Sequence, residues 1–350
     1  MDPETRDRPI DAHHLEGKSV LITGGTGSFG RLCARVLLEH YRPRRVVVFS
    51  RDELKQSEMA AEIDDPRIRF FIGDVRDRER LVRAFDGVDI VIHAAALKQV
   101  PAAEYNPIEA IRTNVNGAAN VIDAALDRSV SRVIALSTDK AANPINLYGA
   151  TKLCSDKLFV AANSYSGMND VRFCAVRYGN VLGSRGSVIP YFLKMKERGE
   201  IPVTDRRMTR FWITLDQGVD FVLRCLDLMR GGELFVPKLP SMRIVDLAEA
   251  LAPGIPVREV GIRPREKLHE VMIPADTARW ALEFDEHYVI QPTFPWWDTA
   301  AFHRASGGRP CSDDFVYASD TNNRWLSIDE LRRMVKYDRD HRAPVRPAVH

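Results

Sequence analysis

The sequence predicts an α/β protein built on a doubly wound parallel sheet, with a smaller α/β substrate-binding lobe after it. Three observations support this fold class. Short apolar runs rich in β-branched residues alternate with stretches of helical period through the first half of the chain. Glycines spaced three apart follow the first run and open the first helix. After about residue 178 the alternation loosens, with more proline and isolated helices.

The strands are expected at six apolar runs, which are in chain order 18–23, 45–50, 68–72, 89–94, 132–137 and 171–177. Amphipathic stretches between them predict helices at 29–40, 53–63, 78–85, 106–127 and 147–165. Strands that alternate with helices in this way form βαβ units, whose strands lie parallel in one sheet. Further helices are predicted at 216–230, 245–251 and 327–335.

These patterns divide the chain into four parts. Residues 1–16 are expected to be a disordered extension, and 17–177 the domain that contains the parallel sheet. Residues 178–336 form the second lobe, although its helix at 216–230 could pack back on the first domain. Residues 337–350 are expected to be a flexible tail, because this end is basic and rich in proline.

Composition and charge restrict the function classes. The formal net charge of +2 gives no electrostatic basis for binding nucleic acid or an anionic membrane. No apolar run reaches the roughly 18 residues of a membrane span, and the polar start has no apolar signal core. The five cysteines show no metal-ligand spacing, so we expect no metal site and free thiols in the cytoplasm.

The segment LITGGTGSFG, residues 21–30, carries the first chemical signal. Its glycines lie where the chain must turn tightly and its backbone must approach a pyrophosphate. The N–H groups of the following helix can then bind that anion. The placement predicts a dinucleotide site whose loop residues are Gly24, Thr26, Gly27, Ser28, Phe29 and Gly30.

The end of the second strand indicates which dinucleotide binds. An NAD site usually has Asp or Glu there, to bind the ribose 2′-hydroxyl. This chain has Ser50 and Arg51, whose hydroxyl and guanidinium suit a 2′-phosphate that a carboxylate would repel. We therefore expect NADP. The alternative is that Arg51 is a solvated loop residue and Asp52 binds NAD.

Two later strand ends supply the rest of the expected cofactor site. Asp74 and Val75 follow the third strand, where an adenine edge would lie. After the fourth strand, the small side chains of Ala94, Ala95 and Ala96 let the chain pass close to the ribose and nicotinamide of the cofactor.

Tyr148 and Lys152 are four residues apart in a predicted helix, so they share one face. A tyrosine with an ordinary pKa of about 10 is a poor base at neutral pH. A cation about 4–6 Å away favours the phenolate, which can deprotonate an alcohol as its hydride leaves for nicotinamide. Thr138, at the end of the fifth strand, can hydrogen-bond the same hydroxyl. Together with the glycine loop, these residues predict a dehydrogenase-type site.

These motifs resemble those of the extended short-chain dehydrogenases/reductases, which have a Rossmann-type sheet. Longer blocks are similar to the inverting UDP-N-acetylglucosamine 4,6-dehydratases of the pseudaminic-acid type. The blocks are SRDELKQSEM, HAAALKQVPAAEYNP, STDKAANPINLYGATK, RYGNVLGSRGSVIPYF, MTRFWI and EKLHE. The resemblance runs from about Gly17 to about Lys336. Arg265 departs from it, because the family usually has glycine there and arginine tolerates a positive φ poorly.

The resemblance implies a lyase that keeps NADP bound. Oxidation of C4 of the sugar to a ketone acidifies the C5 proton, so that water can be eliminated across C5 and C6 before the hydride returns to C6. The implied roles are C4 oxidation for Tyr148 with Lys152, acid at the C6 hydroxyl for Asp139 and base at C5 for Lys140. The implied product is a UDP-4-keto-6-deoxy sugar of L-arabino configuration.

The implied roles of Asp139 and Lys140 make demands on their protonation. A lysine base must be neutral, so its pKa has to fall from about 10.4 toward about 7–8. The pKa of Asp139 has to rise from about 3.9 if it is to act as an acid. A dry pocket beside the cofactor favours both shifts. The alternative interpretation is that the two residues form a plain ion pair at the strand end.

Residue 140 separates the alternatives within this superfamily. Retaining 4,6-dehydratases resemble this chain but carry Asp-Glu at the positions of Asp139 and Lys140. A nucleotide-sugar 4-epimerase, which only oxidises and reduces C4, needs no such pair. A non-catalytic NADP-binding protein is a further alternative, but such proteins typically lack the Tyr148/Lys152 pair, which this chain has.

The second lobe is expected to bind the nucleotide sugar, UDP-N-acetylglucosamine or a close analogue. By resemblance, Arg210, Arg263 and Glu266 contact its diphosphate and uridine ribose. Asn180 follows the sixth strand, near the edge of the sheet where substrates bind. Lys98, after the alanine run, is expected over the sugar ring and beside the cofactor. The family's habit also implies a homo-oligomer.

Overall fold

The computed structural model describes residues 14–167, 170–182 and 188–342. The chain forms two compact units, and each is assembled from separate segments. The first unit takes the chain up to Tyr178, together with Val219–Lys238 and Met272–Val316. The second unit takes Gly179–Gly218, Leu239–Val271 and the chain from Tyr317 onward.

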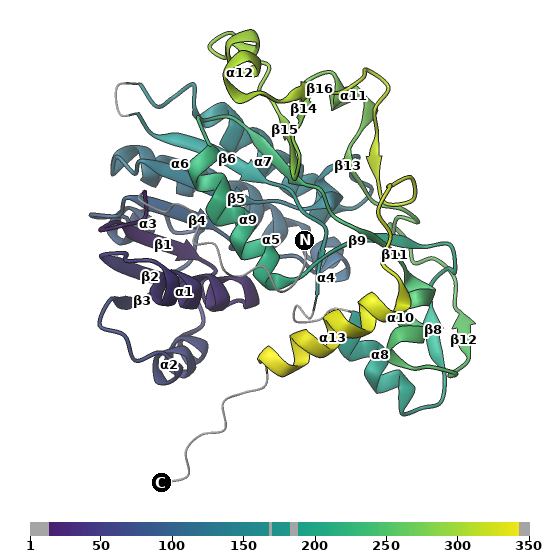
Figure 1. Cartoon of the computed structure of the whole chain (residues 1–350). Coiled ribbons are helices and arrows are strands. Elements are labelled where there is room, and N and C mark those ends of the chain that lie inside the picture. Colours follow the sequence, from purple (N-terminus) through teal and green to yellow (C-terminus); the bar gives the residue numbers. More distant parts are fainter. Residues whose placement is uncertain (1–13, 168–169, 183–187, 343–350) are drawn as a thin grey trace. The chain divides into compact units, whose positions relative to one another are not determined.

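A ten-stranded sheet forms the centre of the first unit (Figure 1). Its parallel part has the order β3 (Ile68–Ile72), β2 (Arg45–Ser50), β1 (Ser19–Thr23), β4 (Ile90–His93), β5 (Arg132–Leu136), β6 (Arg172–Val176) and β10 (Leu234–Pro237). Antiparallel strands β15 (His287–Ile290), β14 (Ala281–Glu283) and β16 (Arg309–Pro310) extend it beyond β10. The six predicted strands, β1 to β6, are therefore six neighbouring parallel strands of this sheet.

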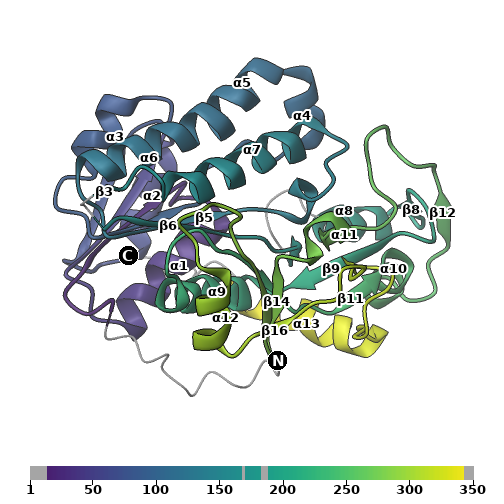
Figure 2. The ribbon, with the colours of Figure 1, turned by 90° about the horizontal axis from the view of Figure 1, so that it is seen from above.

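Helices cover both faces of the sheet, which confirms the doubly wound fold class. The helices before β5 are α1 (Ser28–His40), α2 (Glu53–Glu62), α3 (Arg78–Ala84), α4 (Val100–Tyr105), α5 (Pro107–Ile111) and α6 (Gly117–Asp127). Those after it are α7 (Leu147–Ala162), α9 (Leu215–Leu228), α11 (Ala275–Ala278) and α12 (Thr299–Ser306). In Figure 2, α3, α6 and α7 lie on one face of the sheet, and α1 and α9 on the other.

The core of the first unit lies between the sheet and the helices α3, α6 and α7. Leu21, Val47 and Val91 are aligned across β1, β2 and β4, and all three are buried. Phe85 and Phe159 pack in the same cluster from the helical side. Burial on both faces explains why these strands are continuous apolar runs rather than alternating ones.

The second unit is smaller and less regular. It contains a sheet of β11 (Ser241–Arg243), β9 (Thr209–Ile213) and β7 (Asn180–Val181), and a parallel pair of β12 (Val257–Glu259) and β8 (Ile201–Val203). Its helices are α8 (Val188–Lys196), α10 (Ile244–Leu251) and α13 (Ile328–Arg342). Phe192, Trp212, Leu247 and Leu331 are buried together in its core. The strands β13 (Val271–Ile273) and β17 (Tyr317–Ala318) complete the fold.

The structure corrects three boundaries expected from the sequence. The two parts are not contiguous, because β10 pairs with β6 and returns the chain to the first sheet. The single helix expected over 106–127 is divided by a π-helix, η1 (Arg112–Asn116). Leu15 is fully buried and α13 runs to Arg342, so the ends of the folded part lie beyond 17 and 336. Residues 1–13 and 343–350 lie outside the described residues.

Candidate active site

The candidate site lies where β1, β2, β4 and β5 end, because the carboxyl ends of parallel strands meet at one edge of the sheet. The glycine loop follows β1, Ser50 ends β2, and the alanine run follows β4. The short 3₁₀-helix η2 (Asp139–Ala141) follows β5. The first unit thus brings the predicted cofactor-binding residues and the predicted catalytic residues to the same edge.

The glycine loop has the close packing that a dinucleotide-binding turn requires. Gly24 has a φ of +65°, and a β-carbon there would lie 2.9 Å from the backbone nitrogen of Ala95. The N–H of Gly27 donates to the carbonyl of Gly24 at 2.9 Å, which closes the turn before α1 begins at Ser28. Gly27 caps α1 without a side-chain hydrogen bond. The first N–H groups of α1 are therefore suited to bind an anion.

Asp52 and Arg51, on which the two cofactor alternatives depend, make different contacts at the end of β2. The carboxylate of Asp52 caps α2 and accepts the backbone N–H of Lys55 at 3.0 Å. The hydroxyl of Thr26 donates to the buried hydroxyl of Ser50 at 3.1 Å. Arg51 is about half exposed and lies 3.6 Å from the carboxylate of Asp74. The guanidinium of Arg51 thus lies near the carboxylate of Asp74, while the carboxylate of Asp52 caps α2.

Asp74 is held as a carboxylate by two arginines. Burial alone would raise its pKa, but hydrogen bonds from Arg76 and the charges of Arg76 and Arg51 lower it below the ordinary value. The guanidinium of Arg76 donates to Asp74 at 2.7 Å. Val75, the next residue, is buried, and its carbonyl accepts the amide of Asn120 at 3.0 Å.

The alanine run is held by a residue that the sequence analysis missed. Asn114 accepts the N–H of Leu97 at 2.8 Å and donates to the carbonyl of the same residue at 2.9 Å. It also donates to the hydroxyl of Thr151 on α7 at 3.0 Å. The π-helix η1 contains Asn114, and such single-turn π-helices often mark functional sites. Lys98, just beyond, is exposed, although partial desolvation lowers its pKa.

Thr138, Asp139 and Lys140 form one hydrogen-bonded group at the end of β5. Asp139 is almost fully buried, and its Oδ1 atom accepts from the hydroxyl of Thr138 at 3.0 Å and from the ammonium of Lys140 at 3.0 Å. Its other oxygen, Oδ2, is buried without a hydrogen-bond partner. The ion pair that the sequence analysis considered as an alternative is therefore present. The ion pair uses only Oδ1 of Asp139, and the side chain of Lys140 is 24% exposed.

Tyr148 and Lys152 project from α7, as the sequence predicts, but their electrostatics differ from the expectation. Burial raises the pKa of Tyr148 to about 12, and the charge of Lys140 and a hydrogen bond with Thr138 oppose this only in part. Lys152 is 3% exposed, and burial lowers its pKa while Asp156 raises it. Lys152 is not among the groups that shift the pKa of Tyr148 here, so its stabilisation of the phenolate stays a prediction.

Asp156 is a second residue that the sequence analysis missed. It lies one turn beyond Lys152 on α7 and is 3% exposed. Its Oδ2 atom accepts the hydroxyl of Ser137 at 2.7 Å and the guanidinium of Arg177 at 3.1 Å. A signal was present in the sequence, since Tyr148, Lys152 and Asp156 recur every four residues along one helix face.

Apart from Lys98, which is in the first unit, the predicted substrate residues lie in the second unit. The guanidinium of Arg210 is buried, donates to the carbonyl of Leu268 at 3.0 Å and lies 3.7 Å from the carboxylate of Glu266. Asn180 is in β7, and its Oδ1 atom is buried without a hydrogen-bond partner. Arg263 is exposed. Their contacts with a nucleotide sugar stay predictions.

Arg265, where the family usually has glycine, adopts a positive φ in the structure. Its φ is +66°, in the left-handed region where glycine is favoured. The N–H of Glu266 donates to the carbonyl of Arg263 at 3.1 Å across this turn. The turn therefore forms with arginine at its centre.

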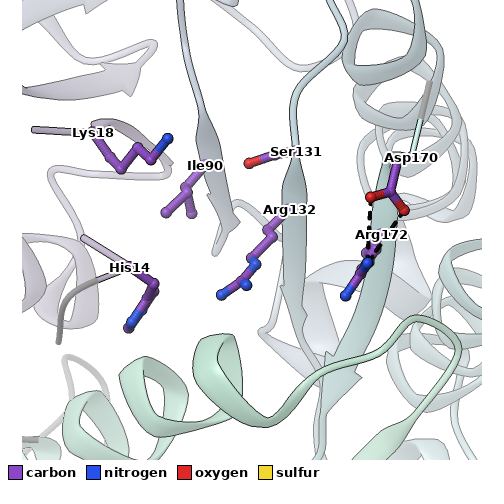
Figure 3. A pocket seen from close by; sticks show the side chains of 7 residues that line it. All are labelled: His14, Lys18, Ile90, Ser131, Arg132, Asp170 and Arg172. Atoms are coloured by element: carbon purple, nitrogen blue, oxygen red, sulfur yellow. Dashed lines mark hydrogen bonds and ion pairs between the residues drawn. The ribbon is translucent and has the colours of Figure 1, made fainter. Parts of the chain in front are cut away.

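A cavity of about 330 Å³ lies at the opposite edge of the first sheet, where the strands begin (Figure 3). It is lined by His14, Lys18, Ile90, Ser131, Arg132, Asp170 and Arg172. Arg172 pairs with Asp170 at 3.3 Å, and Lys18 lies 3.8 Å from Asp89. None of the predicted site residues lines this cavity. The candidate active site is therefore at the other edge.

The described residues contain neither a candidate metal site nor a candidate membrane span. Within the described ranges, no cluster of three or more His, Cys, Asp or Glu side chains is arranged to hold a metal ion. In the same part of the chain, no helix combines the length and the apolar character that crossing a bilayer requires.

The chain is similar in sequence and in structure to several known proteins. The sequence profile of a family described as a polysaccharide biosynthesis protein matches residues 20–292. The chain is 54% identical over 326 residues to the UDP-N-acetylglucosamine 4,6-dehydratase (inverting) of Campylobacter jejuni, which covers 91% of this chain and 98% of that protein. It is 41% identical over 281 residues to a UDP-glucose 4-epimerase of Rickettsia canadensis, which covers 78% of this chain and 82% of that protein. Among solved structures, Pen from Bacillus thuringiensis has a TM-score of 0.84 and 35% identity, covering 93% of this chain and 98% of that one.

Proposed function

The chain belongs to the polysaccharide biosynthesis protein family, and from that premise we propose that it is an inverting UDP-N-acetylglucosamine 4,6-dehydratase. The proposed product is a UDP-4-keto-6-deoxy sugar of L-arabino configuration, of the kind that the pseudaminic-acid pathway uses. One observation carries the proposal. The ammonium of Lys140 lies 3.0 Å from the carboxylate of Asp139 at the carboxyl end of β5, beside Tyr148 and Lys152.

We propose NADP as the cofactor. The uncapped start of α1 fits its diphosphate, and Arg51 with Ser50 fits the 2′-phosphate, because Asp52 is engaged in capping α2. When bound, this dinucleotide supplies a hydride acceptor at C4, a hydride donor at C6 and a positive charge near Tyr148. Ala94 to Ala96, whose side chains are small and half-buried, allow it to approach the sheet edge.

In the proposed oxidation, Tyr148 takes the proton of the C4 hydroxyl. Thr138 hydrogen-bonds the phenol, and Lys140 contributes positive charge near it. We propose that Lys152, four residues after Tyr148 in α7, adds to this charge. The ketone is retained in the product, so this proton leaves the site in each turnover. One proton from water enters at C5 in exchange, which keeps the number of protons balanced.

In the proposed elimination, Lys140 and Asp139 act on adjacent carbons. The lone pair of Lys140 takes the C5 proton, and the electrons of that C–H bond form the double bond to C6. The C6–O bond breaks, and the hydroxyl leaves as water with a proton from Asp139. Lys140 is then an ammonium and Asp139 a carboxylate, which is the charge state of an ion pair such as the one found at 3.0 Å. Transfer of one proton across this contact restores the neutral pair for the next turnover.

Each alternative activity requires a different set of groups from the set in this site. The similarity to a protein named UDP-glucose 4-epimerase favours an epimerase as second candidate. An epimerase only oxidises and reduces C4, which leaves no role for the buried Asp139 and its lysine partner. A retaining dehydratase would have a carboxylate in place of Lys140. A non-catalytic protein would have no use for the pair of Tyr148 and Lys152.

Three further points belong to this proposal. The second unit binds the UDP group through Arg210, Arg263, Glu266 and Asn180, with Lys98 beside the sugar. The protein forms a homo-oligomer, in which exposed apolar side chains such as Tyr105 and Ile108 become buried. It works in the cytoplasm, where the free thiols of Cys154 and Cys311 remain reduced.

The test is incubation with UDP-N-acetylglucosamine in D2O, followed by NMR of the product. We expect loss of the C6 hydroxyl, a ketone at C4, deuterium at C5 and the L-arabino configuration. A product epimerised at C4 with its C6 hydroxyl intact would identify an epimerase. A product with the original C5 configuration would identify a retaining dehydratase.

A further inference from the structure

Asp156 connects the two halves of the candidate site. On α7 it follows Tyr148 and Lys152 at intervals of four residues. The hydroxyl of Ser137, which donates to Asp156 at 2.7 Å, belongs to the residue directly before Thr138. Asp156 therefore lies on the same helix face as Tyr148 and Lys152, and it is hydrogen-bonded to the strand end that leads to Asp139 and Lys140.

Arg177 fixes the same carboxylate from a third element. One nitrogen of its guanidinium donates to Asp156 at 3.1 Å and another to the carbonyl of Met272 at 2.8 Å. Both members of the ion pair are about 95% buried. The next residue, Tyr178, accepts the N–H of Asp139 at 3.1 Å. The end of β6 is thus tied both to Asp156 and to the backbone of the elimination pair.

Asp156 is also the counter-charge of Lys152. Burial disfavours the ammonium of Lys152, and Asp156 is the nearby group that favours it. His93 faces Lys152 from the end of β4, where burial and the charge of Lys152 lower its pKa to about 3, so that it stays neutral. Asp139 and Lys140 act mainly on Tyr148, and Arg177 lies beyond Asp156. The protonation of Lys152 thus depends on Asp156, which is not one of the proposed catalytic residues.

We propose that Asp156 is a positioning residue that keeps Lys152 charged and holds the Tyr148/Lys152 pair in register with Asp139 and Lys140. This role rests on the proposed function, because the two pairs need a common geometry only if oxidation and elimination occur on one bound sugar. The hydrogen bond from Ser137 to Asp156 connects the end of β5 to α7 and is called the tether below. The negative charge of Asp156 favours the ammonium form of Lys152.

Two variants separate charge from tether. Asp156→Asn removes the charge but leaves an oxygen that can accept from Ser137, whereas Ser137→Ala removes this hydrogen bond and leaves the charge. We expect the alkaline limb of the kcat profile of Asp156→Asn to move to lower pH by about one unit, because Lys152 loses its proton more easily. Ser137→Ala should lower kcat by about tenfold at every pH, without moving the limb. Asp123→Asn, at an exposed carboxylate on α6, is the matched control.

A second measurement needs neither substrate nor cofactor. A lysine whose pKa is lower in the folded than in the unfolded protein destabilises the fold below the folded-state pKa, and this effect disappears above the ordinary value of 10.5. The loss of melting temperature in Asp156→Asn should therefore shrink as the pH approaches that value, while the loss in Ser137→Ala stays constant. Asp156→Glu, which keeps the charge, should return the alkaline limb toward its wild-type position.

The outcomes distinguish this inference from the proposed function. If wild-type protein forms no 4-keto product, the proposed function fails, but the melting experiment still tests the effect of Asp156 on Lys152. If Asp156→Asn lowers kcat and melting temperature equally at all pH values, Asp156 is a structural ion-pair residue only, and the inference is overturned.

Discussion

Gly149 lies against the backbone of Lys140, so closely that a β-carbon at Gly149 would be 2.1 Å from the carbonyl oxygen of Lys140. Gly149 directly follows Tyr148 in α7, and its N–H donates to the side-chain oxygen of Asn146, the N-cap residue of the helix, at 2.8 Å. The absence of a side chain at position 149 is therefore what allows the helix with Tyr148 to approach η2 with Asp139 and Lys140.

Gly149→Ala should separate these two elements. The blocking atom is a backbone carbonyl, which cannot rotate away as a flexible side chain would. We expect a loss of about 1–3 kcal/mol in the free energy of unfolding and a fall in kcat of about 100-fold, because displacements near 1 Å have that effect. Urea unfolding and steady-state kinetics measure the two quantities.

Gly218→Ala is the control for this substitution. Gly218 also lies in a helix, α9, but the nearest atom to an added β-carbon is 4.0 Å away. This variant should gain up to about 1 kcal/mol from helix propensity and keep its activity. Wild-type activity in Gly149→Ala would show that the close approach to Lys140 has no part in catalysis.

Lys140→Ala should remove the base at C5 and leave the oxidation of C4. We expect no deuterium at C5 of the sugar in D2O and a loss of product of about 10³-fold, in the range of general acid–base catalysis. Substrate-dependent reduction of bound NADP, followed by nicotinamide absorbance in a single turnover, should persist. Undiminished exchange at C5 would contradict the role of Lys140. Lys157→Ala, at an exposed lysine on α7, is the control.

Local pattern was sufficient to predict the strands β1 to β6 of the first sheet and their carboxyl ends, where the candidate site lies. The run at 45–50 coincides with β2, because it is apolar, rich in valine and bounded by charged residues. The Tyr148 and Lys152 positions were predictable from helical spacing alone. These features depend on a few neighbouring residues, and tertiary packing does not override them.

Features that depend on distant segments were not predictable. β10 is a four-residue strand, and only its pairing with β6 makes it part of the first sheet. The raised pKa of Tyr148 follows from burial, which a sequence does not specify. The spacing of Asp156 places it on the helix face of Tyr148 and Lys152, but its burial and its contacts with Ser137 and Arg177 are visible only in the structure.

Arg51→Ala should change cofactor preference. The guanidinium of Arg51 is about half exposed at the end of β2. In the proposed function it binds the 2′-phosphate, and a charge-assisted hydrogen bond contributes about 1.5–3 kcal/mol. We expect the Kd for NADP to rise by about 10- to 100-fold and the Kd for NAD to change less than threefold, measured by calorimetry. Arg69→Ala, at an exposed arginine on β3, should affect neither. Equal weakening of both dinucleotides would exclude the 2′-phosphate as the partner of Arg51.

Arg265→Gly should stabilise the second unit relative to Arg265→Ala. Arg265 has a φ of +66°, and a residue with a β-carbon in the left-handed region loses about 1–2 kcal/mol there. Glycine avoids this loss, but the greater conformational freedom of its unfolded chain costs about 0.4–1 kcal/mol. We therefore expect the free energy of unfolding of Arg265→Gly to exceed that of Arg265→Ala by about 0.5–1 kcal/mol in urea. Both variants lack the arginine side chain, so their difference isolates the backbone. Gly254→Ala, at a φ of +72° in open space, should lose a similar amount. Equal stability of the two Arg265 variants would show that the turn has relaxed out of the left-handed conformation.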